Sequence, residues 1–350
     1  MLSNTTKKYS KLLKTNSLFP ALLALCTLFF LSCNKEKTTK YTLDGIAQGS
    51  YYHIVYLANE GQNRGVKEEI TTLLTQIDNS LSLWKEGSLI NKINQNQDPI
   101  LDSLFIDCLN WSQKISHLTG GYLDCTIGLL VEKHGFAAKK QEPLNQEIID
   151  SLLQYVGYKT ISIEDGKLRK TYPQTKIDLN AIAQGYTTDK VSWLLKSKGI
   201  TNFIVDIGGE VRASGTKEKG ESWLCGIEQP AQNSLSERSY KTFLKLKDEA
   251  IVTSGSYRKY YQDSLGNRYS HAIDPFTGKS VRHNLLSVSV VDSSATLCDG
   301  LATALLVMGL DSSKTFLSAH PNLKAHFIYF EDNQYKTFTT PNLKLQETSE

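Results

Sequence analysis

Cysteine is scarce in this chain, and the cysteines that occur are not arranged as metal ligands. The 350 residues include six cysteines, with no Cys-x-x-Cys pair and no nearby set of histidines, which argues against a structural zinc site. Cys108 and Cys298 fall within apolar helical patterns, where a thiol packs as a small hydrophobic group. Disulfides form in exported proteins, and an export signal is predicted below for residues 1–32. We nevertheless predict that the four cysteines after residue 33 are free thiols.

The chain also has little net charge. Its 39 basic and 36 acidic residues give a formal charge of +3, and four of the lysines lie in the first 33 residues. Without that segment, 35 basic residues stand against 36 acidic ones. A nucleic-acid-binding protein carries a basic surface, so we expect no nucleic acid among the partners.

The apolar run near the N-terminus is too short to span a bilayer. It extends over fourteen residues, from Leu18 to Leu31, after a lysine-rich start, whereas a spanning helix needs about 20 residues. This is the pattern of an export signal. The run ends at Phe30-Leu31-Ser32-Cys33, which resembles a bacterial lipoprotein cleavage box.

We therefore predict a lipoprotein signal peptide over residues 1–32 and a polar tether over residues 33–40. A lipid on Cys33 would anchor the protein on the periplasmic side of a bacterial membrane. Ordinary signal cleavage, with release of a soluble protein, is the alternative.

Short-period repeats, heptad arrays and long low-complexity stretches are absent, which excludes solenoids and coiled coils.

Strand-like and helix-like segments follow one another without strict β-α-β alternation, so we predict an α+β fold over residues 41–340, as one large domain or two subdomains. The predicted strands are a pair over 41–58 broken at Gln48-Gly49-Ser50, a hairpin over 160–170, and single strands at 203–207, 210–214, 223–228, 242–247, 285–291 and 324–330. Helices are predicted over 70–81, 102–117, 146–156 and 295–308, and a loop over 179–189 leads into a further helix that ends near Leu195.

The helix predicted at 295–308 carries a carboxylate and a hydroxyl one turn apart. Asp299 and Thr303 project from the same face because they are four residues apart. Both are hard oxygen donors, and Mg²⁺ commonly takes one or two protein carboxylates while substrate phosphates and water complete its shell. An acid among apolar neighbours is costly to bury without a partner. The pair predicts a metal site, with a solvated helix edge as the alternative.

A second polar cluster reads Tyr-Ser-His-Ala-Ile-Asp-Pro-Phe-Thr-Gly over residues 269–278. Pro275 and Gly278 favour a turn there. His271 is the candidate general base, because an imidazole titrates near neutrality. Asp274 is the alternative base, or a residue that orients the loop. Together with the metal pair, the cluster predicts phosphate chemistry.

Three segments in this order resemble the motifs of the ApbE family. They are Leu179-Asn180-Ala181-Ile182-Ala183-Gln184-Gly185-Tyr186-Thr187-Thr188-Asp189, then Val252-Thr253-Ser254-Gly255-Ser256-Tyr257-Arg258, then the cluster at 269–278 with Asp299 and Thr303. The resemblance extends over about residues 43 to 310. Members of this family are flavin transferases that use FAD to attach FMN to a protein.

The resemblance implies a Mg²⁺ site formed by Asp299, Thr303 and the backbone carbonyl of Ala183. Gln184 stands where many members carry lysine. Thr253, Ser254, Gly255 and Arg258 would form a wall beside the phosphates, with amides and hydroxyls as donors.

For the flavin nucleotide, the resemblance implicates residues from several further segments. They are Gln48, which replaces a usual methionine, and Trp84, Tyr122, Leu123, Asp124, Thr126, Asp189, Ser254 and Ile273. Trp84 can stack on a planar ring, and Asp124 or Asp189 can accept hydrogen bonds from an adenine amine or a ribose hydroxyl. A core position for Trp84 and a helix cap for Asp124 are the alternatives.

The function implied is Mg²⁺-dependent transfer of FMN from FAD to a threonine or serine hydroxyl of an acceptor protein, with release of AMP. A membrane redox subunit is the expected acceptor. One alternative is a Mg²⁺-dependent FAD pyrophosphatase that gives FMN and AMP, in which water replaces the protein hydroxyl. The other is a lipid-anchored flavin-binding protein without turnover, although binding alone requires neither the metal pair nor His271.

Overall fold

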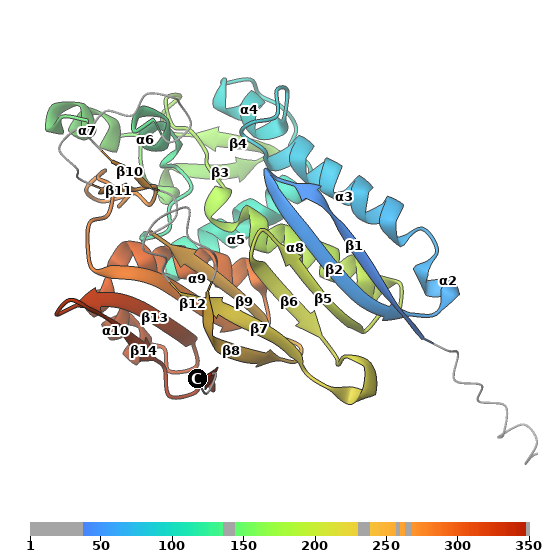
Figure 1. The fold of residues 1–350 in the computed structure, drawn as a ribbon. Coiled ribbons are helices and arrows are strands. Elements are labelled where there is room, and N and C mark those ends of the chain that lie inside the picture. The colour runs from blue at the N-terminus through green and yellow to red at the C-terminus, as the bar shows by residue number, and fades with distance from the viewer. Residues whose placement is uncertain (1–37, 136–143, 230–238, 257–259, 263–267, 348–350) are drawn as a thin grey trace, which may run out of the picture. The chain divides into compact units, whose positions relative to one another are not determined.

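The computed structural model of the chain describes residues 38–135, 144–229, 239–256, 260–262 and 268–347 (Figure 1). The predicted signal peptide and Cys33 lie outside these residues. From Thr39 onward the chain forms one compact unit, so the fold begins two residues before the predicted boundary and is not divided into two subdomains. Within the described residues, no helix combines the length and the apolar character that crossing a membrane requires.

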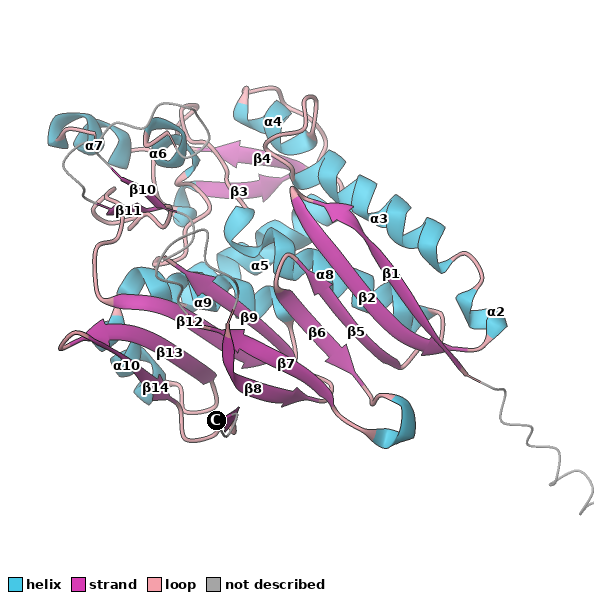
Figure 2. Cartoon of the chain, in the orientation of Figure 1, coloured by secondary structure: helices cyan, strands magenta, loops and turns pink. Residues whose placement is uncertain are grey.

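A large antiparallel sheet forms the middle layer (Figure 2). Its eight strands follow the order β1-β2-β5-β6-β9-β12-β13-β14. Their bounds are Thr39–Ala47, Ser50–Ala58, Asn202–Ile207, Glu210–Ser214, Ala250–Gly255, Leu285–Asp292, Lys324–Glu331 and Gln334–Thr339. All neighbours run antiparallel. In β5, buried residues alternate with half-buried ones, as the period of a strand requires.

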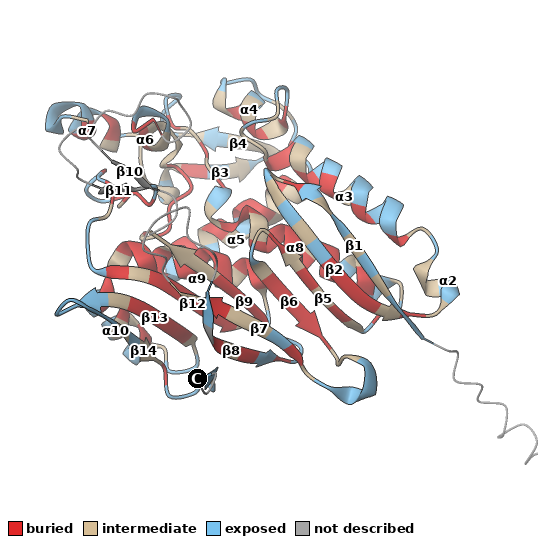
Figure 3. Cartoon of the chain, in the orientation of Figure 1, coloured by how far each residue is buried: buried red, intermediate tan, exposed pale blue. Residues whose placement is uncertain are grey.

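Helices cover one face of this sheet (Figure 1). The longer ones are α3 (Val66–Leu81), α5 (Ser103–Leu118), α8 (Asn180–Ser197), α9 (Ala295–Met308) and α10 (Leu310–Ala319), and the shorter ones are α2 (Glu60–Asn63), α4 (Leu89–Asn94), α6 (Gly128–Lys133) and α7 (Gln146–Leu153). Helix α9 is apolar around most of its circumference, and Leu301 and Leu305 pack in one core with Ile115 of α5 and Val288 of β12. This central position explains why α9 is almost entirely buried (Figure 3).

A small sheet covers part of the opposite face. Its strand order is β15-β8-β7, with bounds Gln346–Glu347, Tyr240–Leu246 and Trp223–Glu228. Val211 and Ile251 of the large sheet pack against Trp223 and Leu246 of the small one. Two hairpins complete the fold, β3 (Ile161–Glu164) with β4 (Lys167–Lys170), and β10 (Tyr260–Gln262) with β11 (Arg268–Ser270).

Helix α8 corrects the prediction of a loop over residues 179–189. The helix begins at Asn180, inside that segment. Asparagine, glycine and two threonines make the segment a poor helix former by intrinsic propensity. The helix is buried around most of its circumference, so its sequence lacks the amphipathic period that marks a surface helix.

The prediction of free thiols is confirmed for the cysteines that the structure describes, Cys108, Cys125, Cys225 and Cys298. Cys108 and Cys298 are fully buried in the main core. Burial raises the pKa of both thiols, so they stay protonated and pack as small apolar groups.

Candidate functional site

A cavity of about 1320 Å³ opens beside the β1–β2 turn, the first turn of α8 and one face of α9. It collects most of the residues predicted for the site. Those that line it are Gln48, Trp84, Tyr122, Leu123, Asp124, Ala183, Ser254, His271, Ile273, Asp299 and Thr303. Thr126, Asp189 and Asp274 are not among the lining residues, and Arg258 lies outside the residues that the structure describes.

Asp299 lies where α8 and α9 touch. Its buried carboxylate accepts a hydrogen bond of 2.9 Å from the backbone amide of Gly185. Only glycine permits this contact, because a Cβ at position 185 would lie 2.4 Å from the carbonyl oxygen of Ala295 and 2.7 Å from Cβ of Asp299. The close approach brings Ala183 of α8 and Asp299 of α9 to the wall of one cavity.

We expect Gly185→Ala to push the two helices apart. Overpacking of a tight contact costs about 1–3 kcal/mol, and the displacement should also reduce metal-dependent activity. Urea unfolding followed by circular dichroism measures the first effect. Gly61→Ala is the matched control, because a Cβ there would meet its nearest neighbour at 3.4 Å. Equal stabilities for the two variants would contradict the assignment of a tight contact at Gly185.

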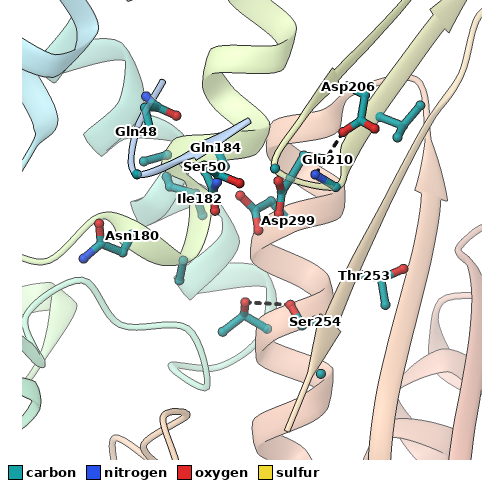
Figure 4. Close-up of a pocket in the computed structure, with 18 of the residues that line it drawn as sticks. Gln48, Ser50, Asn180, Ile182, Gln184, Asp206, Glu210, Thr253, Ser254 and Asp299 are labelled. Carbon is teal, nitrogen blue, oxygen red and sulfur yellow. Dashed lines mark hydrogen bonds between the residues drawn. The ribbon is translucent and has the colours of Figure 1, made fainter. Parts of the chain in front are cut away.

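The wall formed by α8, α9 and β9 presents oxygen atoms of several kinds (Figure 4). Thr303 follows Asp299 by one turn, and its hydroxyl lies 3.1 Å from Oγ of Ser254. The carbonyl oxygen of Ala183 accepts a hydrogen bond of 2.7 Å from the Thr187 hydroxyl. One carboxylate, two hydroxyls and a carbonyl are hard donors that fit Mg²⁺, and they leave positions for phosphate oxygens and water.

The β1–β2 turn reaches the cavity from another side. Gln48 and Gly49 both have positive φ, 54° and 72°, as a two-residue hairpin turn requires. Nε2 of Gln48 donates a hydrogen bond of 2.7 Å to the Thr187 hydroxyl. Its buried Oε1 has no hydrogen-bond partner in the described part of the chain. A buried acceptor of this kind needs a donor, and the cavity can supply one from a ligand.

Aromatic side chains lie at the rim. Trp84 is 72% exposed and lines the cavity, so the alternative of a core position is wrong. The ring of Tyr122 packs edge-to-face on Phe276, with centroids 5.0 Å apart. An exposed indole beside a cavity can stack on a planar ligand.

Asp124 is held in place by its neighbours. One carboxylate oxygen accepts hydrogen bonds from the amide and hydroxyl of Thr126, and the other accepts one of 2.7 Å from the amide of Tyr158. The Thr126 hydroxyl in turn accepts a hydrogen bond of 2.7 Å from the amide of Gly157. Burial raises the pKa of Asp124, although these hydrogen bonds oppose the shift. Asp124 lines the cavity, and Thr126 supports it from behind.

Asp189 does not reach the cavity, which corrects the prediction that it binds the nucleotide. The carboxylate is fully buried. It accepts hydrogen bonds of 3.0 Å from the amides of Ala295 and Thr296 and one of 2.8 Å from the Ser294 hydroxyl, and it forms an ion pair with Arg212. Ser294 is the N-cap of α9 and Ala295 and Thr296 begin its first turn, whereas Arg212 belongs to β6. Asp189 therefore fixes the N-terminus of the helix that carries the candidate metal ligands.

Asp274 orients the turn, which is one of the two roles predicted for it. Its carboxylate accepts hydrogen bonds from the amide of Phe276, at 2.8 Å, and from the hydroxyl of Thr277, at 2.9 Å. Its carbonyl accepts one from the amide of Gly278. His271 is exposed and lines the cavity. The structure thus gives Asp274 the role of orienting the loop and leaves His271 as the candidate base.

Several polar residues that were not predicted from the sequence also line the cavity. Asn180, Asp206 and Glu210 are among them, and Gln184 and Glu210 point toward the region of Asp299 (Figure 4). The sequence signal for this part of the wall is Gly208-Gly209, which lies between the strands at 203–207 and 210–214. A Cβ at Gly208 would lie 2.4 Å from Nε2 of Gln184, so this glycine permits a close approach at the cavity wall.

A sequence model of the ApbE family matches residues 48–327. The chain belongs to the ApbE family. Among curated proteins, it is 32% identical over 330 residues to the FAD:protein FMN transferase of Vibrio cholerae, with 92% of this chain and 97% of that protein covered. It is 30% identical over 343 residues to the FAD:protein FMN transferase of Escherichia coli K12, with 93% and 95% covered.

Solved ApbE structures share the fold. The flavin transferase ApbE from Vibrio cholerae has a TM-score of 0.77 and 31% identity, and the match covers 87% of this chain and 98% of that one. The flavinyl transferase ApbE of Pseudomonas stutzeri has a TM-score of 0.79 and 27% identity, with 87% and 95% covered. The predicted α+β class and the predicted family are therefore confirmed.

Proposed function

We propose that this ApbE protein transfers FMN from FAD to a threonine or serine hydroxyl of an acceptor protein and releases AMP. The observation that carries the proposal is the cavity, where Trp84 and Gln48 meet Asp299, Thr303 and His271. An aromatic platform beside oxygen ligands for a metal suits a flavin nucleotide with its pyrophosphate. The curated relatives are named for this reaction and match nearly their whole length.

Mg²⁺ is the metal that this donor set supports. Asp299, Thr303 and the carbonyl of Ala183 would hold it. When bound, Mg²⁺ polarises phosphoryl oxygens and offsets the charge that develops on them. The first turn of α8 lines the same part of the cavity, and a helix N-terminus favours an anionic group.

His271 would accept the proton from the acceptor hydroxyl as that oxygen bonds to the phosphorus of the FMN moiety. The bond from this phosphorus to the bridging oxygen of the pyrophosphate breaks, and AMP leaves with that oxygen. The turn fixed by Asp274 holds His271 at the cavity. Positioning and electrostatic stabilisation supply most of the rate enhancement in reactions of this class.

A Mg²⁺-dependent FAD pyrophosphatase is the second candidate, and the exposure of His271 favours it because water can reach an exposed imidazole. Incubation with FAD, Mg²⁺ and candidate membrane redox subunits separates the two. A transferase leaves a fluorescent flavin on the acceptor in a denaturing gel. A pyrophosphatase releases only free FMN and AMP.

We further propose that the protein is lipid-anchored through Cys33 on the periplasmic side of a bacterial membrane, on the strength of the sequence of residues 1–33. Cys33→Ser should then move the protein from the membrane fraction to a soluble or unprocessed form, while the folded domain keeps its activity. Fractionation with an antibody against the folded domain tests this. Membrane retention of a processed Cys33→Ser protein would point to attachment through a partner.

A further inference from the structure

The cavity extends beyond the candidate metal site along the outer face of the large sheet. Alternate residues of β2, from Tyr51 to Leu57, form one wall, and residues 223–226 of β7 form the other. None of the residues predicted for flavin or metal lies on these walls. The whole cavity, about 1320 Å³, exceeds the roughly 300–1,000 Å³ of most small-molecule sites. We call the part between these two walls the β2–β7 groove, and the volume of the whole cavity leaves room for a second substrate there.

The groove follows the free edge of β7. This strand ends the small sheet and pairs only with β8 among the strands that the structure describes. Leu224 and Cys225 both line the cavity, although successive side chains of a strand point to opposite faces. The edge of the strand itself must therefore face the groove. Such an edge offers N–H and C=O groups to which another extended chain can pair.

Large apolar side chains stand exposed on this groove. Leu224 is 47% exposed and Tyr240 is 40% exposed. They flank Gly226, where a Cβ would lie 2.7 Å from the Tyr240 ring, so the glycine lets that ring lie across β7. Exposed aromatic and aliphatic side chains beside a cleft are typical of surfaces that bind proteins.

We propose that the β2–β7 groove binds the acceptor protein as an extended segment that pairs with the free edge of β7. This inference rests on the proposed function. The groove is continuous with the flavin end of the cavity, because the consecutive residues Gln48, Gly49, Ser50 and Tyr51 all line it. An acceptor segment bound in the groove thus places its hydroxyl toward Asp299. Pairing through the backbone supplies affinity, and contacts with Leu224 and Tyr240 supply selectivity.

The groove also sets the length of the segment. Residues 223–226 of β7 line the groove, and four strand residues at about 3.3 Å each span roughly 13 Å. About four acceptor residues can therefore pair with this part of β7. An acceptor whose target hydroxyl lies inside a helix would have to unfold locally to enter.

The test uses the full-length chain in detergent, the acceptor found by in-gel flavin fluorescence, and a synthetic peptide that spans its labelled residue. Leu224→Glu and Tyr240→Glu should each raise the KM for both acceptors about tenfold, as for a central interface residue, while the KM for FAD changes less than about twofold. Leu118→Glu and Tyr335→Glu are the matched controls. These residues are 37% and 48% exposed, neither lines the cavity, and both variants should behave as wild type.

An unchanged acceptor KM in both groove variants, with transfer still occurring, would overturn the groove as the docking site. If the wild-type protein attaches no covalent flavin to any acceptor, the proposed function is wrong and the groove proposal fails with it. Hydrogen exchange supplies a readout independent of any variant. The peptide should slow exchange of backbone amides within residues 223–228, because a paired edge protects them, and protection elsewhere without protection of β7 would also overturn the proposal.

Discussion

Asp299→Ala should abolish Mg²⁺-dependent turnover while the protein stays folded. Asp299 is the one carboxylate in the proposed ligand set, so its removal takes away the charge that holds the metal. The substitution also leaves the amide of Gly185 without its acceptor, which costs about 1–3 kcal/mol. That loss is small against the roughly 5–15 kcal/mol that keep a domain folded. Turnover of FAD over a range of Mg²⁺ concentrations, with a thermal melt of each variant, measures both effects.

Asp299→Asn is the matched control. Its amide oxygen can still accept the hydrogen bond from Gly185, so stability should recover, but activity should not because the charge is gone. Thr303→Ala should reduce activity less than either, since it removes a neutral ligand. Wild-type turnover of Asp299→Ala at limiting Mg²⁺ would show that the metal assignment is wrong.

His271→Ala should reduce the rate of transfer by roughly 10² to 10⁴, the usual loss when a general base is removed. The affinity for FAD should change little, because the imidazole acts on the incoming hydroxyl. Single-turnover kinetics and a separate FAD titration distinguish the two quantities. His117→Ala is the control, because His117 is exposed and does not line the cavity. A large loss of FAD affinity with normal single-turnover chemistry would make His271 a binding residue.

The strand and helix pattern of the fold could be predicted where a segment carries enough apolar residues to show a period or a continuous run. The strands at 203–207 and 285–291 and the helix at 295–308 lie where the sequence predicts them, because their apolar residues follow the period of the element or end at a glycine such as Gly309. The position of β14 could not be predicted, because all six of its residues are exposed or half-buried. An edge strand of this kind has a weak hydrophobic pattern.

The sequence predicted most of the residues that form the candidate site, but not the role of each one. The spacing of Asp299 and Thr303 places both on one helix face, and the structure keeps them at the cavity. The roles of Asp189 and Asp274 depend on which amides their carboxylates meet, and those amides belong to segments whose approach no local pattern specifies. Asp189 meets residues 105 to 107 positions away in the sequence. A carboxylate within a motif can therefore support the structure of the site without contacting the ligand.

The balance of products tests the central claim most directly. Wild-type protein, FAD, Mg²⁺ and an acceptor are incubated together, and AMP, free FMN and the mass of the acceptor are measured over time. Transfer through the FMN phosphate predicts that the acceptor gains the mass of FMN less one water, and that AMP appears in equal amount to the covalent flavin. Replacement of the acceptor hydroxyl should remove the label and leave at most slow FAD hydrolysis, since water can enter the same site. AMP and free FMN forming at one rate with or without acceptor, and no covalent flavin on any acceptor, would contradict the transferase account and establish a pyrophosphatase.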